Sequence, residues 1–174
     1  LRQLAAECFD ADGVLTPRGF QQFDAFIKRA KRLSDDVQYH PDAMVFIASV
    51  RDAEVRKARI TRMFPQGIHD DRWSSLLRAP LYPYQKAGAL FAASAGRCLI
   101  ADDMGLGKTI QAIAAGEILA QGLGVEKVLI LCPVSLKHQW KQEIERFTTR
   151  PVQVIQGSWP QRQRQYQVAT CFMI

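Results

Sequence analysis

The sequence predicts an α/β protein in which part of a parallel sheet with flanking helices follows a mainly helical segment. Two observations predict this class. After residue 80, short and nearly continuously apolar runs alternate with helix-length segments, as in parallel strands buried on both faces. Before residue 78, the chain shows helical periodicity and turn residues. We therefore expect a helical segment over 1–78 and an α/β domain over 79–174.

The N-terminal segment is expected to hold two main helices. The first has an apolar face made of four residues, Phe20, Phe23, Phe26 and Ile27. Loops are expected at 10–13 and 16–19. The run His40-Pro41-Asp42 predicts the start of a second helix that ends near Met63. Residues 43–50 are apolar enough to form a strand instead, and periodicity does not decide between the two.

The C-terminal segment is expected to alternate between strands and helices. Gly122 and Gly124 predict the end of its first helix after the loop, and Ser135 is the expected N-cap of the next helix. In chain order we expect strand 98–101, loop 102–107, helix 108–120, strand 128–132, helix 135–147, strand 151–155, helix 160–167 and strand 168–174.

Composition excludes several classes of protein. The 174 residues are 48% hydrophobic and 23% charged, which excludes a disordered chain and a coiled coil. No apolar run approaches the roughly 18 residues of a membrane helix, so no membrane association is expected. The chain begins without Met and without a signal peptide, which favours a cytoplasmic piece of a longer protein. A net charge of +6 favours a polyanionic partner.

The four cysteines are widely scattered and form no Cys-x-x-Cys pair: Cys8, Cys98, Cys132 and Cys171. Cys98 and Cys132 lie in strand-like apolar runs. We therefore expect them to be buried thiols in a reducing compartment rather than metal ligands or disulfides.

The strongest chemical motif is the run Asp102-Asp103-Met104-Gly105-Leu106-Gly107-Lys108-Thr109. Its Gly-Lys-Thr end fits a phosphate-binding loop, and a strand-like run precedes it while a helix follows. The glycines let backbone N–H groups surround a phosphate, and the helix N-terminus adds its positive dipole. Lys108 would then reach the β- and γ-phosphates, and Thr109 would ligate Mg²⁺. The alternative is a purely structural glycine turn.

One residue departs from the general loop pattern, because Asp102 stands where the first glycine is usual. Two like charges about 6 Å apart cost roughly 3 kcal/mol at an effective dielectric of 20. Asp102 and Asp103 must therefore point away from the phosphates, lie across Mg²⁺ or pair with a cation.

The run from Ala101 to Ile113 resembles motif I of the Swi/Snf-type DNA translocases, a branch of helicase superfamily two. The run Leu81-Tyr82-Pro83-Tyr84-Gln85-Lys86-Ala87-Gly88 resembles the family's Q-motif, which contacts adenine through its Gln. The run Leu129-Ile130-Leu131-Cys132-Pro133-Val134-Ser135-Leu136, followed by Gln139-Trp140 and Glu143, resembles motif Ia, which lies along a DNA strand. The three motifs occur in the family's order within about residues 80–150.

The resemblance implies the first part of a RecA-like motor lobe that binds ATP and Mg²⁺ and contacts double-stranded DNA through its backbone. The remaining motor lobes would belong to the same parent chain, in the cytoplasm or, in a bacterium, at the nucleoid. The implied nucleotide contacts are Gln85, Asp103, Met104, Gly105, Leu106, Gly107, Lys108 and Thr109, with Lys108 and Thr109 catalytic and Thr109 on Mg²⁺. The implied DNA contacts are Pro133, Val134, Ser135 and Leu136.

Each motif also has a simpler interpretation. Gln85 could be an ordinary exposed residue, and 133–135 could be a plain strand-to-helix loop. Trp140 is expected to pack in the core rather than stack on a base. Arg162 and Arg164 are expected on a solvated helix face rather than on DNA.

The sequence lacks the Asp-Glu-x-His or Asp-Glu-x-Gln box that the family uses to hold Mg²⁺. We therefore expect an N-terminal piece of a longer ATP-dependent DNA translocase. Two alternatives stay open: a nucleotide-binding or interaction module without turnover of its own, and an ATPase directed at RNA or protein.

Overall fold

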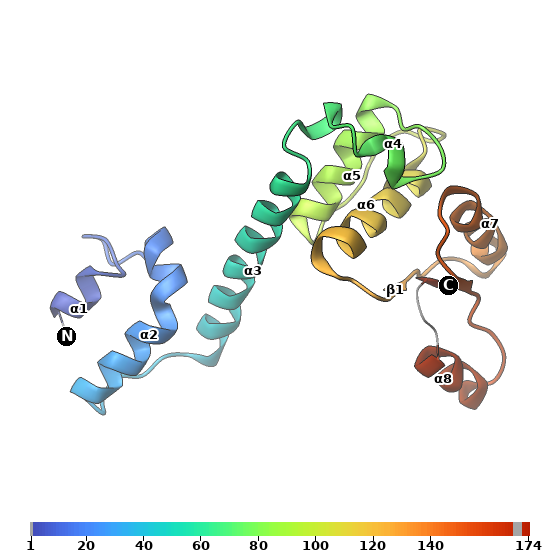
Figure 1. Ribbon diagram of the computed structural model, residues 1–174. Coiled ribbons are helices and arrows are strands. Elements are labelled where there is room, and N and C mark those ends of the chain that lie inside the picture. Colours follow the sequence, from blue (N-terminus) through green and yellow to red (C-terminus); the bar gives the residue numbers. More distant parts are fainter. Residues whose placement is uncertain (1, 169–171) are drawn as a thin grey trace. The chain divides into compact units, whose positions relative to one another are not determined.

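The computed structural model of the chain describes residues 2–168 and 172–174 (Figure 1). It combines helices with a parallel sheet, which confirms the predicted class. No helix among these residues is both long and apolar enough to cross a membrane. The elements are α1 (Arg2–Ala6), α2 (Pro17–Leu33), α3 (Pro41–Met63), η1 (Gly67–His69), α4 (Trp73–Leu76), α5 (Pro83–Ala95), α6 (Lys108–Leu123), β1 (Val128–Leu129), η2 (Val134–Leu136), α7 (Lys137–Phe147), β2 (Val152–Gln153), α8 (Trp159–Val168) and β3 (Phe172–Met173).

Contacts divide the chain into two compact units, one up to Val55 and one from Arg56 onward. Helix α3 therefore begins in the first unit and ends in the second. The predicted domains, 1–78 and 79–174, stay a prediction, because a contact-based unit does not by itself set the limits of a domain.

Helix α2 begins earlier than the sequence predicts. The Thr16 Oγ1 accepts a hydrogen bond of 3.0 Å from the Gly19 N–H, and Pro17 occupies the first helical position. The prediction of a loop at 16–19 is therefore wrong for residues 17–19, which belong to α2. A Thr N-cap followed by Pro is a favourable helix start, because the ring fixes a helical φ and its missing N–H needs no partner there.

The first unit has a small core between α2 and α3. Phe23, Ile27 and Ile47 are buried, and Phe20 and Phe26 are partly buried against them. The predicted face of α2 is thus confirmed. Residues 43–50 are helical, which excludes the strand alternative. A hydrogen bond of 2.9 Å from Arg51 lowers the pKa of the Asp24 carboxyl below its usual value.

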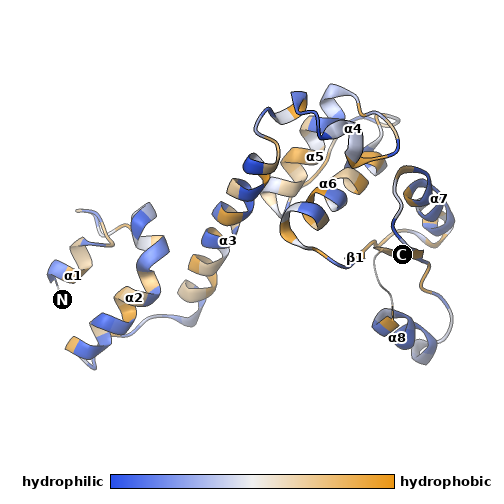
Figure 2. Cartoon of the chain, in the orientation of Figure 1, coloured by the Kyte–Doolittle hydropathy of each residue, from blue (hydrophilic) through white to orange (hydrophobic). Residues whose placement is uncertain are grey.

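The core of the second unit forms where α5 packs on α6. Ala89 and Ala93 of α5 have no exposed surface, and Ala114 and Ile118 of α6 are equally buried. Small side chains on α5 let the two helices approach closely. In Figure 2, α5 and α6 carry apolar residues, whereas α7 is mostly hydrophilic. Helix α6 starts at Lys108 as predicted, and Gly124, with φ +70°, caps it as the glycine pair predicts.

The described sheet has three parallel strands in the order β1-β3-β2. Phe172 of the central strand is in register with Val128 on one side and Val152 on the other. The parallel arrangement is confirmed, although each strand is two residues long. Of the predicted strand 168–174, Val168 belongs to α8, and 169–171, including Cys171, lie outside the described residues.

The predicted strand at 98–101 is wrong. These residues are irregular, and their backbone makes no ladder hydrogen bond with any described residue. Leu99 is 81% exposed, and Cys98 is exposed rather than buried. Cys132 is partly buried. An apolar run forms a strand only where a neighbouring backbone can pair with it.

Candidate nucleotide-binding site

The loop before α6 contains two glycines with positive φ. Gly105 and Gly107 adopt φ values of +86° and +79°, which favour glycine. Packing also favours glycine at position 107, because a Cβ there would lie 2.6 Å from the Gln85 Nε2. The loop runs directly into the first turn of α6 at Lys108, so free backbone N–H groups of that turn face the loop.

Lys108 is held against the loop that precedes it. Its Nζ donates hydrogen bonds of 2.7 Å to the Asp102 carbonyl oxygen and 3.0 Å to the Asp103 carbonyl oxygen. The ammonium group is therefore positioned at the mouth of the loop by backbone acceptors rather than by an acidic side chain. Such contacts can be exchanged for phosphate oxygens without leaving a carboxylate unpaired.

The Asp102 carboxylate is turned toward α6. Its Oδ2 accepts a hydrogen bond of 2.6 Å from the Nε2 of Gln111, which has no exposed surface. The sequence left three arrangements open for this carboxylate: pointing away from the phosphates, lying across Mg²⁺ or pairing with a cation. The structure has the first, with the carboxylate turned toward α6. The partner is a neutral amide rather than a cation. Sequence reasoning missed Gln111, although a Gln amid the apolar face of a helix was a usable signal.

Gln85 links the start of α5 to the loop. It is 7% exposed, so the alternative that Gln85 is an ordinary exposed residue is wrong. Its Oε1 accepts from the Tyr82 N–H at 3.0 Å, and its Nε2 donates to the Leu106 carbonyl oxygen at 3.2 Å. The Tyr82 and Tyr84 rings stack beside it, with centroids 5.8 Å apart. The Q-like motif and the loop thus form one connected structure.

A cavity of about 720 Å³ lies between this structure and α7. Five of the predicted nucleotide contacts line it: Gln85, Gly105, Gly107, Lys108 and Thr109. Asp103, Met104 and Leu106 do not line it, and the Met104 side chain is 96% exposed. From α7 the cavity receives Gln139, Glu143 and Arg146. Sequence reasoning assigned none of these three residues to the nucleotide site.

The predicted DNA contacts lie on an exposed turn and are not among the described residues that line this cavity. Residues 133–136 are all exposed, and η2 covers the last three of them. Ser135 is not the N-cap of α7, because that helix starts two residues later and Leu136 precedes it. The 3₁₀ turn takes the place of the predicted first helical turn, as often happens at helix starts. Trp140 is partly buried against the core, as predicted.

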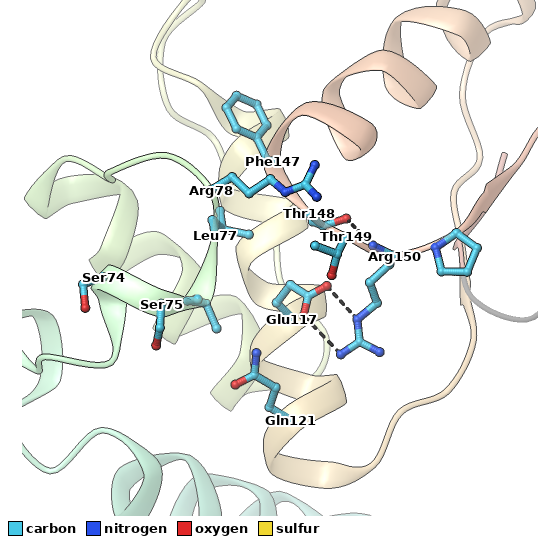
Figure 3. Close-up of a pocket in the computed structure, with 12 residues that line it drawn as sticks. Ser74, Ser75, Leu77, Arg78, Glu117, Gln121, Phe147, Thr148, Thr149 and Arg150 are labelled. Atoms are coloured by element: carbon cyan, nitrogen blue, oxygen red, sulfur yellow. Dashed lines mark hydrogen bonds and ion pairs between the residues drawn. The ribbon is translucent and has the colours of Figure 1, made fainter.

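A second hollow of about 490 Å³ lies beside α6 (Figure 3). Glu117, which is 5% exposed, receives two hydrogen bonds from the Arg150 guanidinium, of 2.8 and 3.1 Å. Figure 3 shows the two side chains meeting from α6 and from the segment after α7. Sequence reasoning missed this pair, because nothing in the spacing of residues 117 and 150 indicates contact.

Comparison with known proteins finds one matching family model and several similar proteins. The family model is described as SNF2-related domain and matches residues 26–173. The chain is 47% identical over 72 residues to the human DNA annealing helicase and endonuclease ZRANB3, covering 41% of this chain and 6% of that protein. It is 45% identical over 86 residues to the RNA polymerase-associated protein RapA of Yersinia pestis (strain Pestoides F), covering 45% of this chain and 9% of that protein.

A third similar protein is the bovine SWI/SNF-related matrix-associated actin-dependent regulator of chromatin subfamily A-like protein 1. It is 46% identical over 77 residues, which cover 44% of this chain and 8% of that protein. The chain therefore matches less than a tenth of the length of each of these three relatives.

Proposed function

The chain belongs to the SNF2-related family of helicase superfamily two, and from this premise we propose that it forms the ATP-binding part of an ATP-dependent double-stranded DNA translocase. The observation that carries the proposal is the meeting of Gln85, Gly107, Lys108 and Thr109 around one cavity. These four come from two segments of the chain, and the fold brings them together as a nucleotide site requires.

The residues around the cavity fit ATP and Mg²⁺ in their chemistry. The Lys108 ammonium and the N–H groups of the first turn of α6 would hold the phosphates, and the Thr109 hydroxyl would ligate Mg²⁺. The Gln85 amide would exchange its present partners for the adenine edge, because an amide donates and accepts at once. Bound Mg²⁺ would neutralise phosphate charge during transfer. The hydrogen bond from Gln111 keeps the Asp102 carboxylate directed toward α6, so its charge would not face the phosphates.

Double-stranded DNA is the proposed partner of the exposed turn at 133–136. The turn presents backbone groups and the Ser135 hydroxyl at the surface, which suits contact with phosphates rather than with bases. The whole unit from Arg56 onward holds 16 Lys and Arg against 8 Asp and Glu, whereas residues 1–55 hold 7 against 9. The positive charge of the chain is therefore concentrated in the unit that carries the motifs.

Hydrolysis requires groups that these 174 residues do not supply as motifs, namely the acidic box and an arginine from a second lobe. We propose that the remainder of the parent protein supplies both. The match to this chain covers only 6% of ZRANB3, so most of such a relative lies outside it.

The test is the ATPase rate of the full-length protein, titrated separately with duplex DNA, single-stranded DNA and RNA. We expect duplex DNA to stimulate the rate most. The Lys108→Ala variant should lower the stimulated rate by about a hundredfold or more, because it removes the charge that the phosphates meet. The matched control is Lys127→Ala, an exposed lysine of the same unit that lines none of the cavities described above and should keep the rate.

An ATPase that responds to RNA and not to duplex DNA would replace this proposal with the RNA-directed alternative. ATP binding without turnover under every condition would favour a nucleotide-binding module instead.

A further inference from the structure

Three arginines gather around a separate surface hollow of about 490 Å³ in the second unit. Arg59 and Arg62 lie one turn apart on α3, and Arg72 precedes α4. All three are exposed. Met63, Gln121 and Gly122 complete the lining.

The hollow lies far from the nucleotide cavity. Gln121 and Gly122 are near the C-terminal end of α6, whereas Lys108 begins that helix. At a rise of about 1.5 Å per residue, the stretch from Lys108 to Gln121 spans about 20 Å. No residue lines both hollows.

Among the described residues, the three guanidinium groups have no acidic partner. Within residues 2–168 and 172–174, none of them makes a side-chain hydrogen bond or ion pair. Asp70 is near in sequence, but its carboxylate accepts from the backbone N–H groups of Gln66 and Arg72 at 3.3 and 3.1 Å. Asp71 is exposed and is the other acid in this stretch. Residues 56–78 hold six basic and two acidic side chains, so the positive charge is uncompensated.

The scaffold beneath the arginines is fixed. A Cβ at Gly122 would lie 3.2 Å from the Met63 sulfur, so α3 and α6 approach closely at the floor of the hollow. Arg72 precedes Trp73, which is 4% exposed and packs against the tilted Phe64 ring, with centroids 4.8 Å apart. The Trp73 Nε1 donates to the Gly67 carbonyl oxygen at 2.9 Å. The backbone that carries all three arginines is therefore held by buried contacts.

We propose that Arg59, Arg62 and Arg72 form a second phosphate-binding site, which contacts the backbone of duplex DNA apart from the turn at 133–136. Guanidinium groups bind phosphates in a bidentate manner, and three unpaired ones around one hollow suit a polyanion. The choice of duplex DNA rests on the proposed function, while the arginine site itself rests on the geometry.

The test is binding of a fluorescent duplex to the full-length protein without nucleotide, over a series of salt concentrations. The Arg59→Gln/Arg62→Gln/Arg72→Gln variant should reduce the slope of log K against log salt by about 2 to 3, because each duplex phosphate contact contributes about 0.9. The control Arg18→Gln/Lys57→Gln/Lys127→Gln removes the same charge from other exposed positions and should leave the slope within about 0.5 of wild type. Equal slopes for the two variants would overturn the proposal.

A second measurement needs no variant. Phenylglyoxal modification of the wild-type protein should be slowed at Arg59, Arg62 and Arg72 when duplex DNA is bound. Unchanged modification at all three would overturn the proposal, and so would protection by inorganic polyphosphate but not by duplex. Neither measurement uses ATP turnover, so the two proposals can fail separately. If duplex DNA stimulates the ATPase but the three arginines affect neither the salt slope nor the protection, only this inference is refuted. If the arginines affect both but duplex DNA does not stimulate the ATPase, only the proposed function is refuted.

Discussion

Gln111 donates a hydrogen bond to the Asp102 carboxylate, and Gly88 leaves the space that the Gln111 side chain fills. The Gln111 side chain is fully buried, and its Oε1 has no hydrogen-bond partner in the described part of the chain. A Cβ on Gly88 of α5 would collide with that oxygen. A buried amide oxygen without a partner is costly, and here the bond from Nε2 to Asp102 offsets the cost. The arrangement keeps a carboxylate out of the loop centre.

The Gly88→Ala substitution should lower the free energy of unfolding by up to about 2 kcal/mol. Overpacking costs about 1–3 kcal/mol, and it outweighs the helix-propensity gain of about 1 kcal/mol. ATP affinity should fall as well, because the displaced Gln111 releases the Asp102 carboxylate. Urea unfolding followed by circular dichroism and ATP titration measure the two effects.

Gly116→Ala is the control for this prediction. Its added Cβ would lie 3.4 Å from the Phe172 ring, an ordinary contact, so the variant should keep or gain stability by up to about 1 kcal/mol. If Gly88→Ala were as stable as Gly116→Ala, Gln111 would not be held as the structure indicates.

At the scale of elements, α6 connects the nucleotide loop to the segment after α7. Its first residue, Lys108, contacts the loop, and Glu117 farther along receives both hydrogen bonds from Arg150. The Glu117 side chain is 6% exposed and that of Arg150 is 32% exposed, so the pair is largely shielded from water. Such a pair fixes geometry more than it adds stability, but breaking it leaves a buried charge behind.

Arg150→Met should therefore destabilise the protein by about 3 kcal/mol, and Glu117→Leu/Arg150→Met should recover part of the loss. The exposed pair Lys141–Glu145, at 3.7 Å, supplies the control, since Lys141→Met should cost less than about 1 kcal/mol. Thermal unfolding of the wild type, Glu117→Leu, Arg150→Met and the double variant measures the coupling. Equal effects of Arg150→Met and Lys141→Met would contradict it.

At the scale of the whole molecule, the second unit exposes several large apolar side chains. Leu99 is 81% exposed, Leu131 is 86% exposed, and Leu129 in β1 is 50% exposed. Exposed apolar clusters beside unpaired strand edges promote association.

We expect the 174-residue chain, when produced by itself, to self-associate with rising concentration. Leu99→Lys/Leu131→Lys should shift it toward the monomer, because two charges now interrupt the apolar surface. The control Val14→Lys/Val45→Lys changes exposed apolar residues of the first unit and should not shift it. Sedimentation velocity decides, and a wild-type chain that stays monomeric at all concentrations would contradict the prediction.

The elements that the sequence predicted well are those whose cause is local. The α2 face, the extent of α3, the start of α6 at Lys108 and its end at Gly124 follow from periodicity, proline and glycine. The strand at 98–101 was predicted from its apolar residues alone, and it failed because a strand depends on a partner elsewhere in the chain.

The sequence by itself determined the family and the parallel α/β class, because motifs and apolar patterns can be recognised in the order of residues alone. Only the tertiary structure decided that Gln85 is buried against the loop, that Gln111 holds Asp102, and that Glu117 meets Arg150. The tertiary structure also brings Arg59, Arg62 and Arg72 together around one hollow. Each of these depends on the packing of helices distant in sequence, which spacing along the chain does not encode.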